Sequence, residues 1–260
     1  MRCAVVGHVE WVEFARVPRM PAAGEIVHAD RVWEEPAGGG AVVARQLALL
    51  AGRCELFTAL GEDALGRASA ERLAELGIDV HVKWGGATRR AWTHVDGAGE
   101  RTITVLGDKL LPAASLPLDG YDLVFFVAGE PAALRSARGA RFVAAPVREL
   151  PTLQNGDVEL DLLVASADDP GKRYDGSLRV RHVALTDGAN GGTLDGTPYA
   201  AVTAPRIVDT YGAGDSFAAA LAFALARGDD PQSAAELAAR AGAAVIGGAG
   251  PYEAQLAFRA

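Results

Sequence analysis

The stretch that decides the fold is Asp209-Thr-Tyr-Gly-Ala-Gly-Asp-Ser216, which runs directly into the alanine-rich apolar segment Phe217–Arg227. The small residues Gly-Ala-Gly allow a tight turn, and the segment behind them predicts a helix. The first N–H groups of a helix have no partner within it, and the helix dipole puts partial positive charge at that end. The motif therefore predicts a helix N-terminus that can bind an anion such as a phosphate oxygen.

Asp215 lies inside this predicted anion cradle. A carboxylate there can accept a proton from an attacking hydroxyl group, which suggests a site of phosphoryl transfer. The alternative is an ordinary helix start, because Asp, Ser and Gly are common at helix N-termini and in turns. The motifs along the rest of the chain help to decide between a phosphoryl-transfer site and an ordinary helix start.

The composition indicates a globular chain with an acidic surface. It has 260 residues, 50% of them hydrophobic, with a formal net charge of −8 and a pI of about 5.2. This length suits one α/β domain with an appendage. Because the sequence has no basic stripe with interleaved aromatic residues, we expect no nucleic-acid partner.

The cysteines and the apolar runs indicate the cellular setting. Cys3 and Cys54 are too few for a disulfide framework and lack metal-ligand spacing. The N-terminal residues form no apolar secretion signal, and no later segment reaches the roughly 18 apolar residues of a membrane span. We therefore expect a cytoplasmic protein with no membrane partner.

Short apolar runs alternate with helix-forming segments along most of the chain. The runs predict buried strands at Cys3–Val6, Leu56–Leu60, Tyr121–Val127, Arg141–Ala145, Leu160–Val164 and Val180–Leu185, and a late hairpin at Gly191–Leu194 and Tyr199–Val202. The helix-forming segments are Ala41–Ala51, Ala64–Leu76, Phe217–Arg227 and one that begins at Asp230-Pro231. This alternation predicts a doubly wound, mostly parallel α/β sheet flanked by helices.

Two regions do not fit that sheet. Arg90–Val95 and Arg101–Leu106 are β-prone and flank Asp96-Gly-Ala-Gly-Glu100, which predicts a hairpin. Glu25–Trp33 predicts a strand that leaves the main sheet. We interpret both as a small β-sheet lid, formed by about residues 25–34 and 88–107 of a single domain that spans residues 1–260.

Several motifs occur in an order and spacing that resemble the ribokinase-like (PfkB) carbohydrate kinase family. Val208–Phe217 resembles its C-terminal signature, Asp-Thr-x-Gly-Ala-Gly-Asp, and Pro36–Ala44 resembles its glycine-rich N-terminal signature. The further matches are Gly61-Glu-Asp63 with Gly66, the hairpin Arg90–Leu106 at the place of the lid, and Thr186-Asp-Gly188 near the nucleotide. Together the matches cover essentially the whole chain.

The resemblance implies a transferase with the ribokinase-like fold and a β lid. It would use ATP and Mg²⁺ to phosphorylate a hydroxymethyl group of a small, sugar-like acceptor. By resemblance Asp215 is the catalytic base, and the backbone N–H groups of Gly212, Ala213 and Gly214 form the anion hole. The glycines Gly38, Gly39 and Gly40 would let the substrate approach the backbone closely.

The acceptor side departs from the family pattern. Val42 stands where the glycine-rich signature usually has an Asn that binds the sugar, and Val12 stands where the early strand usually ends in a sugar-binding Asp. Glu10 and Glu13 flank Val12 and are candidates to replace that Asp, the alternative being surface carboxylates. The identity of the acceptor is therefore open.

The nucleotide side also differs. The family has Asn-x-x-Glu near Mg²⁺ and the phosphates, and this chain has Ser166-Ala-Asp-Asp169. Asp169 could hold Mg²⁺ through water, or the acidic pair could cap a helix before Pro170. Asp209 is a candidate ligand of a monovalent cation such as K⁺, or a structural anchor of its loop. The expected nucleotide contacts are Ser166, Thr186, Gly188, Gly212 and Gly214.

Charged and aromatic side chains of the lid are further candidates. Arg89, Arg90 and Arg101 could meet a phosphate or an acidic substrate, or lie in solvent. Trp92 could cover the substrate, with Trp33 beside it, or be buried in a lid–lid contact of a homodimer.

The favoured function is therefore a sugar kinase, with two alternatives. A nucleoside kinase of the same fold would use aromatic lid contacts for its base. A non-catalytic nucleotide or sugar sensor would explain Val12 and Val42, but the intact Asp215 opposes it. A dinucleotide-dependent dehydrogenase is poorly supported, because no Gly-x-Gly-x-x-Gly follows the first strand.

Overall fold

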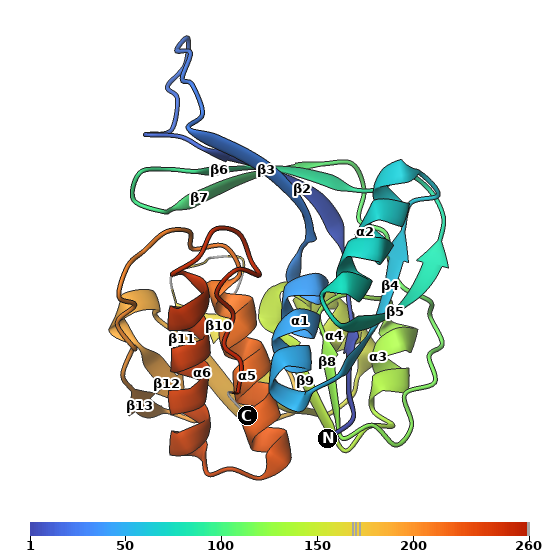
Figure 1. The fold of residues 1–260 in the computed structure, drawn as a ribbon. Helices are drawn as coiled ribbons and strands as arrows, with labels where there is room; N and C mark the ends of the chain where they lie inside the picture. The colour runs from blue at the N-terminus through green and yellow to red at the C-terminus, as the bar shows by residue number, and fades with distance from the viewer. Residues whose placement is uncertain (168, 170, 172, 259–260) are drawn as a thin grey trace.

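A large sheet with helices on both faces carries a smaller sheet above one end, as the computed structural model shows (Figure 1). The structure describes residues 1–167, 169, 171 and 173–258. Within them the large sheet has nine strands in the order β13-β12-β11-β10-β9-β8-β1-β4-β5. The seven neighbouring strands β11, β10, β9, β8, β1, β4 and β5 are parallel, and β12 and β13 are antiparallel. This arrangement confirms the predicted α/β class.

The strands of the large sheet agree with most of the predicted runs. Their bounds are β1 Cys3–Val6, β4 Cys54–Leu60, β5 Ile78–Trp84, β8 Leu123–Phe126, β9 Phe142–Pro146, β10 Leu160–Ser166, β11 Val180–Thr186, β12 Gly192–Leu194 and β13 Thr197–Tyr199. The prediction of a strand at Tyr199–Val202 is wrong, because β13 ends at Tyr199. The tight turn Asp195-Gly196 places β13 earlier in the chain than expected.

Helices cover both faces, and each face has its own apolar core. On one face lie α1 Gly39–Ala51, α2 Ala64–Glu75, α5 Ala213–Arg227 and α6 Pro231–Val245, and on the other lie α3 Pro131–Ala137 and α4 Leu150–Gly156. Successive residues of a strand point to opposite faces, so Val5 packs in the first core and Val6 in the second. The four predicted helices are confirmed, whereas α3 and α4 were not expected.

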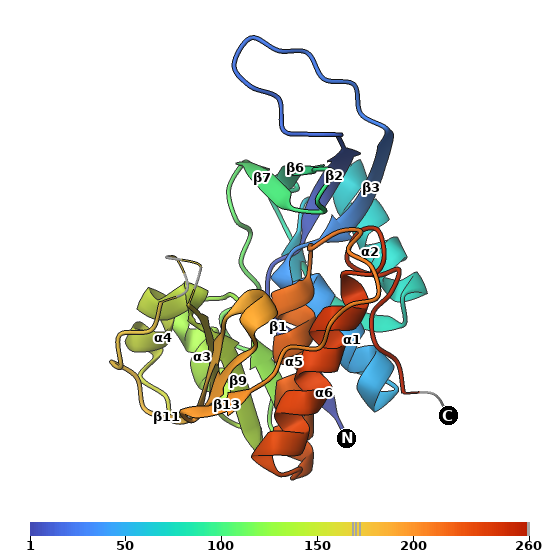
Figure 2. The ribbon, with the colours of Figure 1, turned by 90° about the vertical axis from the view of Figure 1, so that its left-hand side faces the viewer.

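The small sheet, which we call the lid, has the strand order β3-β2-β6-β7. Its strands are β2 Glu10–Arg16, β3 Arg31–Ala37, β6 Arg90–Val95 and β7 Arg101–Leu106. The hairpin of β6 and β7 has the predicted bounds. The predicted strand Glu25–Trp33 is wrong in its first half, because residues 25–30 belong to the loop that projects beyond the lid (Figure 2). The chain also enters the lid earlier than expected, through β2.

A short glycine-containing joint ties the lid to the large sheet. A Cβ added at Gly66 would lie 2.0 Å from the carbonyl oxygen of Gly61, so only glycine fits there. Asp63 caps α2 by accepting a hydrogen bond from the N–H of Gly66 at 2.8 Å, and it accepts two more from the N–H (2.7 Å) and hydroxyl (2.5 Å) of Thr88. Because Thr88 lies two residues before β6, one carboxylate fixes both α2 and the base of the lid.

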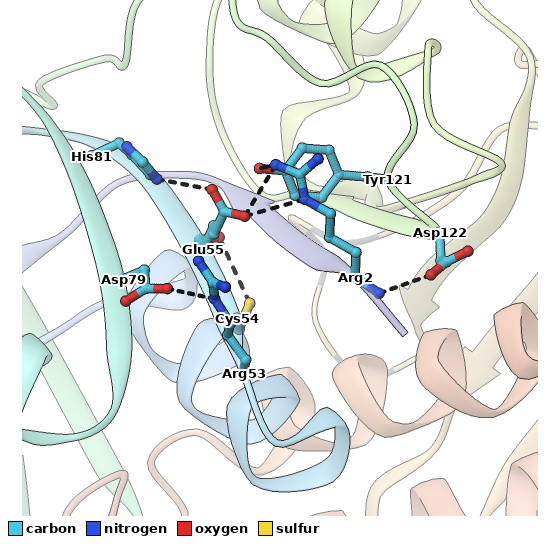
Figure 3. A network of polar contacts seen from close by, with 8 residues as sticks. All are labelled: Arg2, Arg53, Cys54, Glu55, Asp79, His81, Tyr121 and Asp122. Carbon is cyan, nitrogen blue, oxygen red and sulfur yellow. Dashed lines mark hydrogen bonds and ion pairs between the residues drawn. The ribbon is translucent and has the colours of Figure 1, made fainter.

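A second polar network lies at the opposite end of the sheet (Figure 3). Arg2 donates to Glu55 at 3.3 Å and to Tyr121 at 2.9 Å, and Nε2 of His81 lies 2.9 Å from Glu55. Burial raises the pKa of Glu55, but the hydrogen bonds from its neighbours outweigh burial and lower it. Since Glu55 is near the amino end of β4, this network holds strand starts together.

We expect Asp63→Ala to lower the free energy of unfolding by about 2–4 kcal/mol at pH 7, because it removes a helix cap and hydrogen bonds to a charged group. The hydrogen bond from the Thr88 side chain lowers the pKa of Asp63, so its contribution is present above about pH 4 and is lost as the pH falls further. Urea unfolding at several pH values measures both effects. Asp79→Ala, which removes an exposed ion pair with Arg53, is the control; equal losses in the two variants would contradict the prediction.

Candidate active site

Three backbone segments meet at the carboxyl end of β1. A Cβ added at Gly40, in the first turn of α1, would lie 2.6 Å from the carbonyl oxygen of His8. A Cβ added at Gly39 would lie 3.4 Å from Oδ1 of Asp215, in the first turn of α5. The glycine run therefore lets the N-terminus of α1 pack against the β1–β2 turn and against the Asp215 carboxylate.

The helix start predicted within Gly212-Ala213-Gly214 is confirmed. Gly212 has a φ of 83° in the left-handed region, and α5 begins with Ala213 and carries Asp215 in its first turn. No side chain caps this N-terminus, so its early N–H groups are not taken up by a cap. The N–H of Ala213 makes only a long hydrogen bond, 3.4 Å, to the carbonyl of Thr210.

Tyr211 connects the two glycine motifs, and sequence reasoning missed it. Its hydroxyl accepts a hydrogen bond from the N–H of Gly38 at 3.1 Å, and its ring meets the ring of Phe14 edge-on at 5.1 Å. Burial raises the pKa of Tyr211, which keeps the hydroxyl neutral. It occupies the variable position of the Asp-Thr-x-Gly signature, so the motif itself gave no signal.

Asp209 anchors the same loop. Its carboxylate accepts hydrogen bonds from the N–H of Tyr211 at 2.8 Å and from the N–H of Gly250 at 2.9 Å. Burial raises the pKa of Asp209. The structural role is thus observed, and the cation-binding role stays a prediction. Among the described residues, no group of three or more His, Cys, Asp or Glu side chains is arranged to hold a metal ion.

A partly buried polar cluster lies beside the glycines, formed by His8, Glu10 and Arg89. Glu10 is 6% exposed, and its Oε2 lies 3.3 Å from Nε of Arg89. Burial raises the pKa of Glu10, and burial with the charges of Lys109 and Arg89 lowers the pKa of His8 to about 3. Within the described structure, Nδ1 of His8, Oε2 of Glu10 and Nε of Arg89 form no hydrogen bond.

The two valines that stand where the family usually has polar residues are core residues. Val12 and Val42 are both 0% exposed and pack in one cluster with Phe14, Ala91 and Tyr211. This cluster joins the inner face of the lid to α1 and to the loop before α5. An apolar contact therefore occupies the two positions, and neither valine is exposed to a ligand.

The structure separates Glu13 and Trp92 from this cluster. Val12 and Phe14 face inward, so Glu13 between them lies on the outer face of the lid, opposite Trp92 in the parallel pair of β2 and β6. Glu13 forms an ion pair there with Arg90, and Trp92 is 45% exposed. Trp33 instead stacks on Phe14, with ring centroids 4.9 Å apart.

The nucleotide candidates lie together at the carboxyl edge of the large sheet. Ser166 and Thr186 are partners in adjacent parallel strands, and Gly188 begins the turn that follows β11. Asp169 forms an ion pair with Arg148, with 2.5 Å between Oδ2 and Nη2. The alternative of a helix cap before Pro170 involves residues 168 and 170, which lie outside the described residues.

Comparisons with known proteins identify the family of this chain. A family model described as pfkB family carbohydrate kinase matches residues 1–122 and 160–256. An ATP-dependent ribose-1-phosphate kinase of Halopiger xanaduensis is 28% identical, over 99% of this chain and 96% of that protein. Over the part of the chain that the structure describes, no helix is long and apolar enough to cross a membrane.

Solved structures share the fold. A nucleoside kinase of Methanocaldococcus jannaschii has a TM-score of 0.77 at 19% identity, covering 99% of this chain and 96% of that one. A ribokinase of Thermotoga maritima has a TM-score of 0.78 at 22% identity, covering 98% and 96%. At these identities the likeness concerns the fold.

We expect Tyr211→Phe to leave the buried N–H of Gly38 without a partner, at a cost of about 1–3 kcal/mol. Hydrogen exchange of the Gly38 amide should become faster, and urea unfolding should show the loss of stability. Tyr174→Phe, which removes a hydroxyl bonded to Leu178 elsewhere in the chain, is the control and should not change the exchange of Gly38. Unchanged exchange in Tyr211→Phe would refute the role of the Tyr211 hydroxyl in holding the N–H of Gly38.

Proposed function

This chain belongs to the pfkB family of carbohydrate kinases, and from that premise we propose that it transfers the γ-phosphoryl group of ATP to a primary hydroxyl group of a small, sugar-like acceptor. One observation carries the proposal. Asp215 stands in the first turn of an uncapped helix, against the glycine at the start of a second helix. A carboxylate and two helix N-termini at one point suit proton acceptance beside a transferring phosphoryl group.

In this mechanism Asp215 orients the acceptor hydroxyl and takes its proton as the new O–P bond forms. Phosphoryl transfer has a loose transition state, so positioning and charge stabilisation supply most of the rate. The N–H groups of Gly212, Ala213 and Gly214 would stabilise charge on the transferring oxygens. Closure of the lid would exclude water, which otherwise competes as the acceptor.

The residues present fit ATP and Mg²⁺. Ser166, Thr186 and Gly188 would hold the nucleotide along the carboxyl edge of the sheet, and Asp169 would hold Mg²⁺ through water. When bound, the metal supplies positive charge that neutralises the phosphates. Asp209 would contribute to a K⁺ site only if its carboxylate accepts the cation in addition to its two N–H donors.

On the acceptor side we propose Glu10, and not Glu13, as the carboxylate that meets the substrate. Glu10 is buried beside the glycine run, whereas Glu13 lies on the outer face of the lid. The exposed Trp92 on that outer face suits the lid–lid contact of a homodimer better than a cover over the substrate. We propose the cytoplasm as the setting.

A nucleoside kinase is the second candidate. Ile103 and Val105 of β7 share the inner face of the lid with Thr93 and Ala91, and they are 41% and 43% exposed. Apolar side chains on that face could contact a base, and a nucleoside kinase is among the similar structures. A non-catalytic sensor is the third reading, and the presence of Asp215 opposes it.

We expect Asp215→Asn to lower kcat by about 10²–10⁴-fold with little change in the KM for ATP, because the amide cannot take the proton. Release of ADP is measured with a panel of sugars, sugar derivatives and nucleosides. Asp229→Asn, just beyond the other end of α5, is the matched control and should retain activity. If no acceptor stimulates ADP release, or if Asp215→Asn is fully active, the mechanism is wrong.

A further inference from the structure

The hairpin tip of the lid, residues 96–100 between β6 and β7, contacts the loop that precedes α5 (Figure 1). The N–H of Thr210 donates a hydrogen bond to the carbonyl oxygen of Gly99 at 2.9 Å. Gly99 is buried there with a φ of 83°, and a Cβ at this position would lie 2.8 Å from Cγ2 of Ile207. Because this contact needs glycine, the fit between the tip and the loop is specific.

The hairpin tip is held in shape by Asp96. Its carboxylate accepts hydrogen bonds from the N–H groups of Ala98 at 2.9 Å and Glu100 at 3.0 Å. The N–H of Gly99 donates to the carbonyl oxygen of Asp96 at 2.9 Å. A side-chain oxygen that bonds to the backbone of its own turn fixes the turn. The carbonyl of Gly99 is therefore presented to the loop in one direction.

Two arginines on the inner face of the lid bond to the same loop. In the register of the small sheet, Arg16 of β2 is the partner of Val95 of β6, which in turn is the partner of Arg101 of β7. Register partners share a face, and Val95 is 0% exposed, so both arginines lie on the inner face. Nη1 of Arg16 donates to the carbonyl oxygen of Val208 at 3.0 Å, and Nη1 of Arg101 donates to the hydroxyl of Thr210 at 3.2 Å.

Asp209 lies between these two attachment points. Burial raises the pKa of Asp209, whereas its hydrogen bonds and the charges of Arg101 and Arg16 act in the opposite direction. Away from the lid, the N–H groups of Val208 and Asp209 donate to the carbonyl oxygen of Ile246 at 2.8 and 3.3 Å. The loop is thus held from one side by the segment after α6 and from the other side by the lid.

We infer that Arg16 and Arg101 are positioning residues of the phosphoryl-transfer site, which hold the loop before α5 in place when the lid is down. The inference rests on the proposed kinase function. α5 begins without a side-chain cap at Ala213, three residues after Thr210, so a displaced loop would also displace the first N–H groups of the helix. These groups would be aligned for the transferring phosphoryl group only while the arginines bond to the loop, and an open lid would leave ATP unreactive towards water.

The test measures how strongly an acceptor stimulates ADP release by the purified full chain. The acceptor is the most active member of the panel of sugars, sugar derivatives and nucleosides. We expect Arg16→Gln to lower kcat about 10-fold and Arg101→Gln, whose hydrogen bond is longer and exposed, about 3-fold, with little change in the KM for ATP. The stimulation by the acceptor should fall in the same proportion, because slow ADP release without acceptor does not depend on the lid. Arg16→Lys keeps a charged donor and should restore part of the loss.

Hydrogen exchange of the Thr210 amide is a readout that does not depend on activity. This amide bonds to the tip of the lid, so its exchange should become faster in Arg16→Gln and Arg101→Gln. Arg31→Gln is the matched control. Arg31 is the register partner of Arg16 in β3, but its guanidinium lies over the ring of Trp33 at 4.9 Å, at the other edge of the lid. It should leave both kcat and the exchange of Thr210 as in the wild type.

Three outcomes would overturn the inference. Full stimulation by the acceptor in the double variant Arg16→Gln/Arg101→Gln would leave the kinase function intact and show that the arginines do not position the loop. An equal loss of ADP release with and without acceptor would assign them a general structural role. Absence of ADP release from the wild type with every acceptor would refute the proposed function, and the inference with it.

Discussion

Close approach between two helix N-termini is the constraint on which the rest of the structure depends. The helices α1 and α5 begin at the same end of β1, and each brings partial positive charge there. Two such ends repel each other unless negative groups lie between them. Asp215 reaches Gly39 and Glu10 reaches Gly38, so carboxylates lie at the point of contact. A Cβ at Gly39 would lie 2.9 Å from Cγ1 of Val127, and one at Gly38 would lie 3.3 Å from Cγ of Glu10, so the glycines permit this packing.

The lid is packed together with the loop that starts α5. Phe14 stacks on Trp33 within the lid, and its edge meets Tyr211, which in turn holds the N–H of Gly38. Val12 and Val42 fill the space between these elements. A polar side chain at either valine would be buried in this cluster, at a cost in free energy unless it found a partner. The apolar residues at both positions therefore follow from packing, and the polar pair beside the glycine run is formed by Glu10 and Arg89.

Much of the fold could be predicted because local signals agreed with the tertiary structure. β1 and the hairpin of β6 and β7 have their predicted bounds, since buried apolar runs and a glycine-rich turn are local features. The helices α3 and α4 have only seven residues each, too few for a helical period to appear. β3 contains Pro36, which normally argues against a strand, but β3 is an edge strand and tolerates it.

The site was less predictable, because strand direction and register decide which side chains meet. Arg89 and Arg90 are neighbours in the sequence, yet Arg89 pairs with the buried Glu10 while Arg90 pairs with Glu13 on the outer face. Because successive residues of a strand point to opposite faces, the register of β6 against β2 decides which of the two arginines meets Glu10.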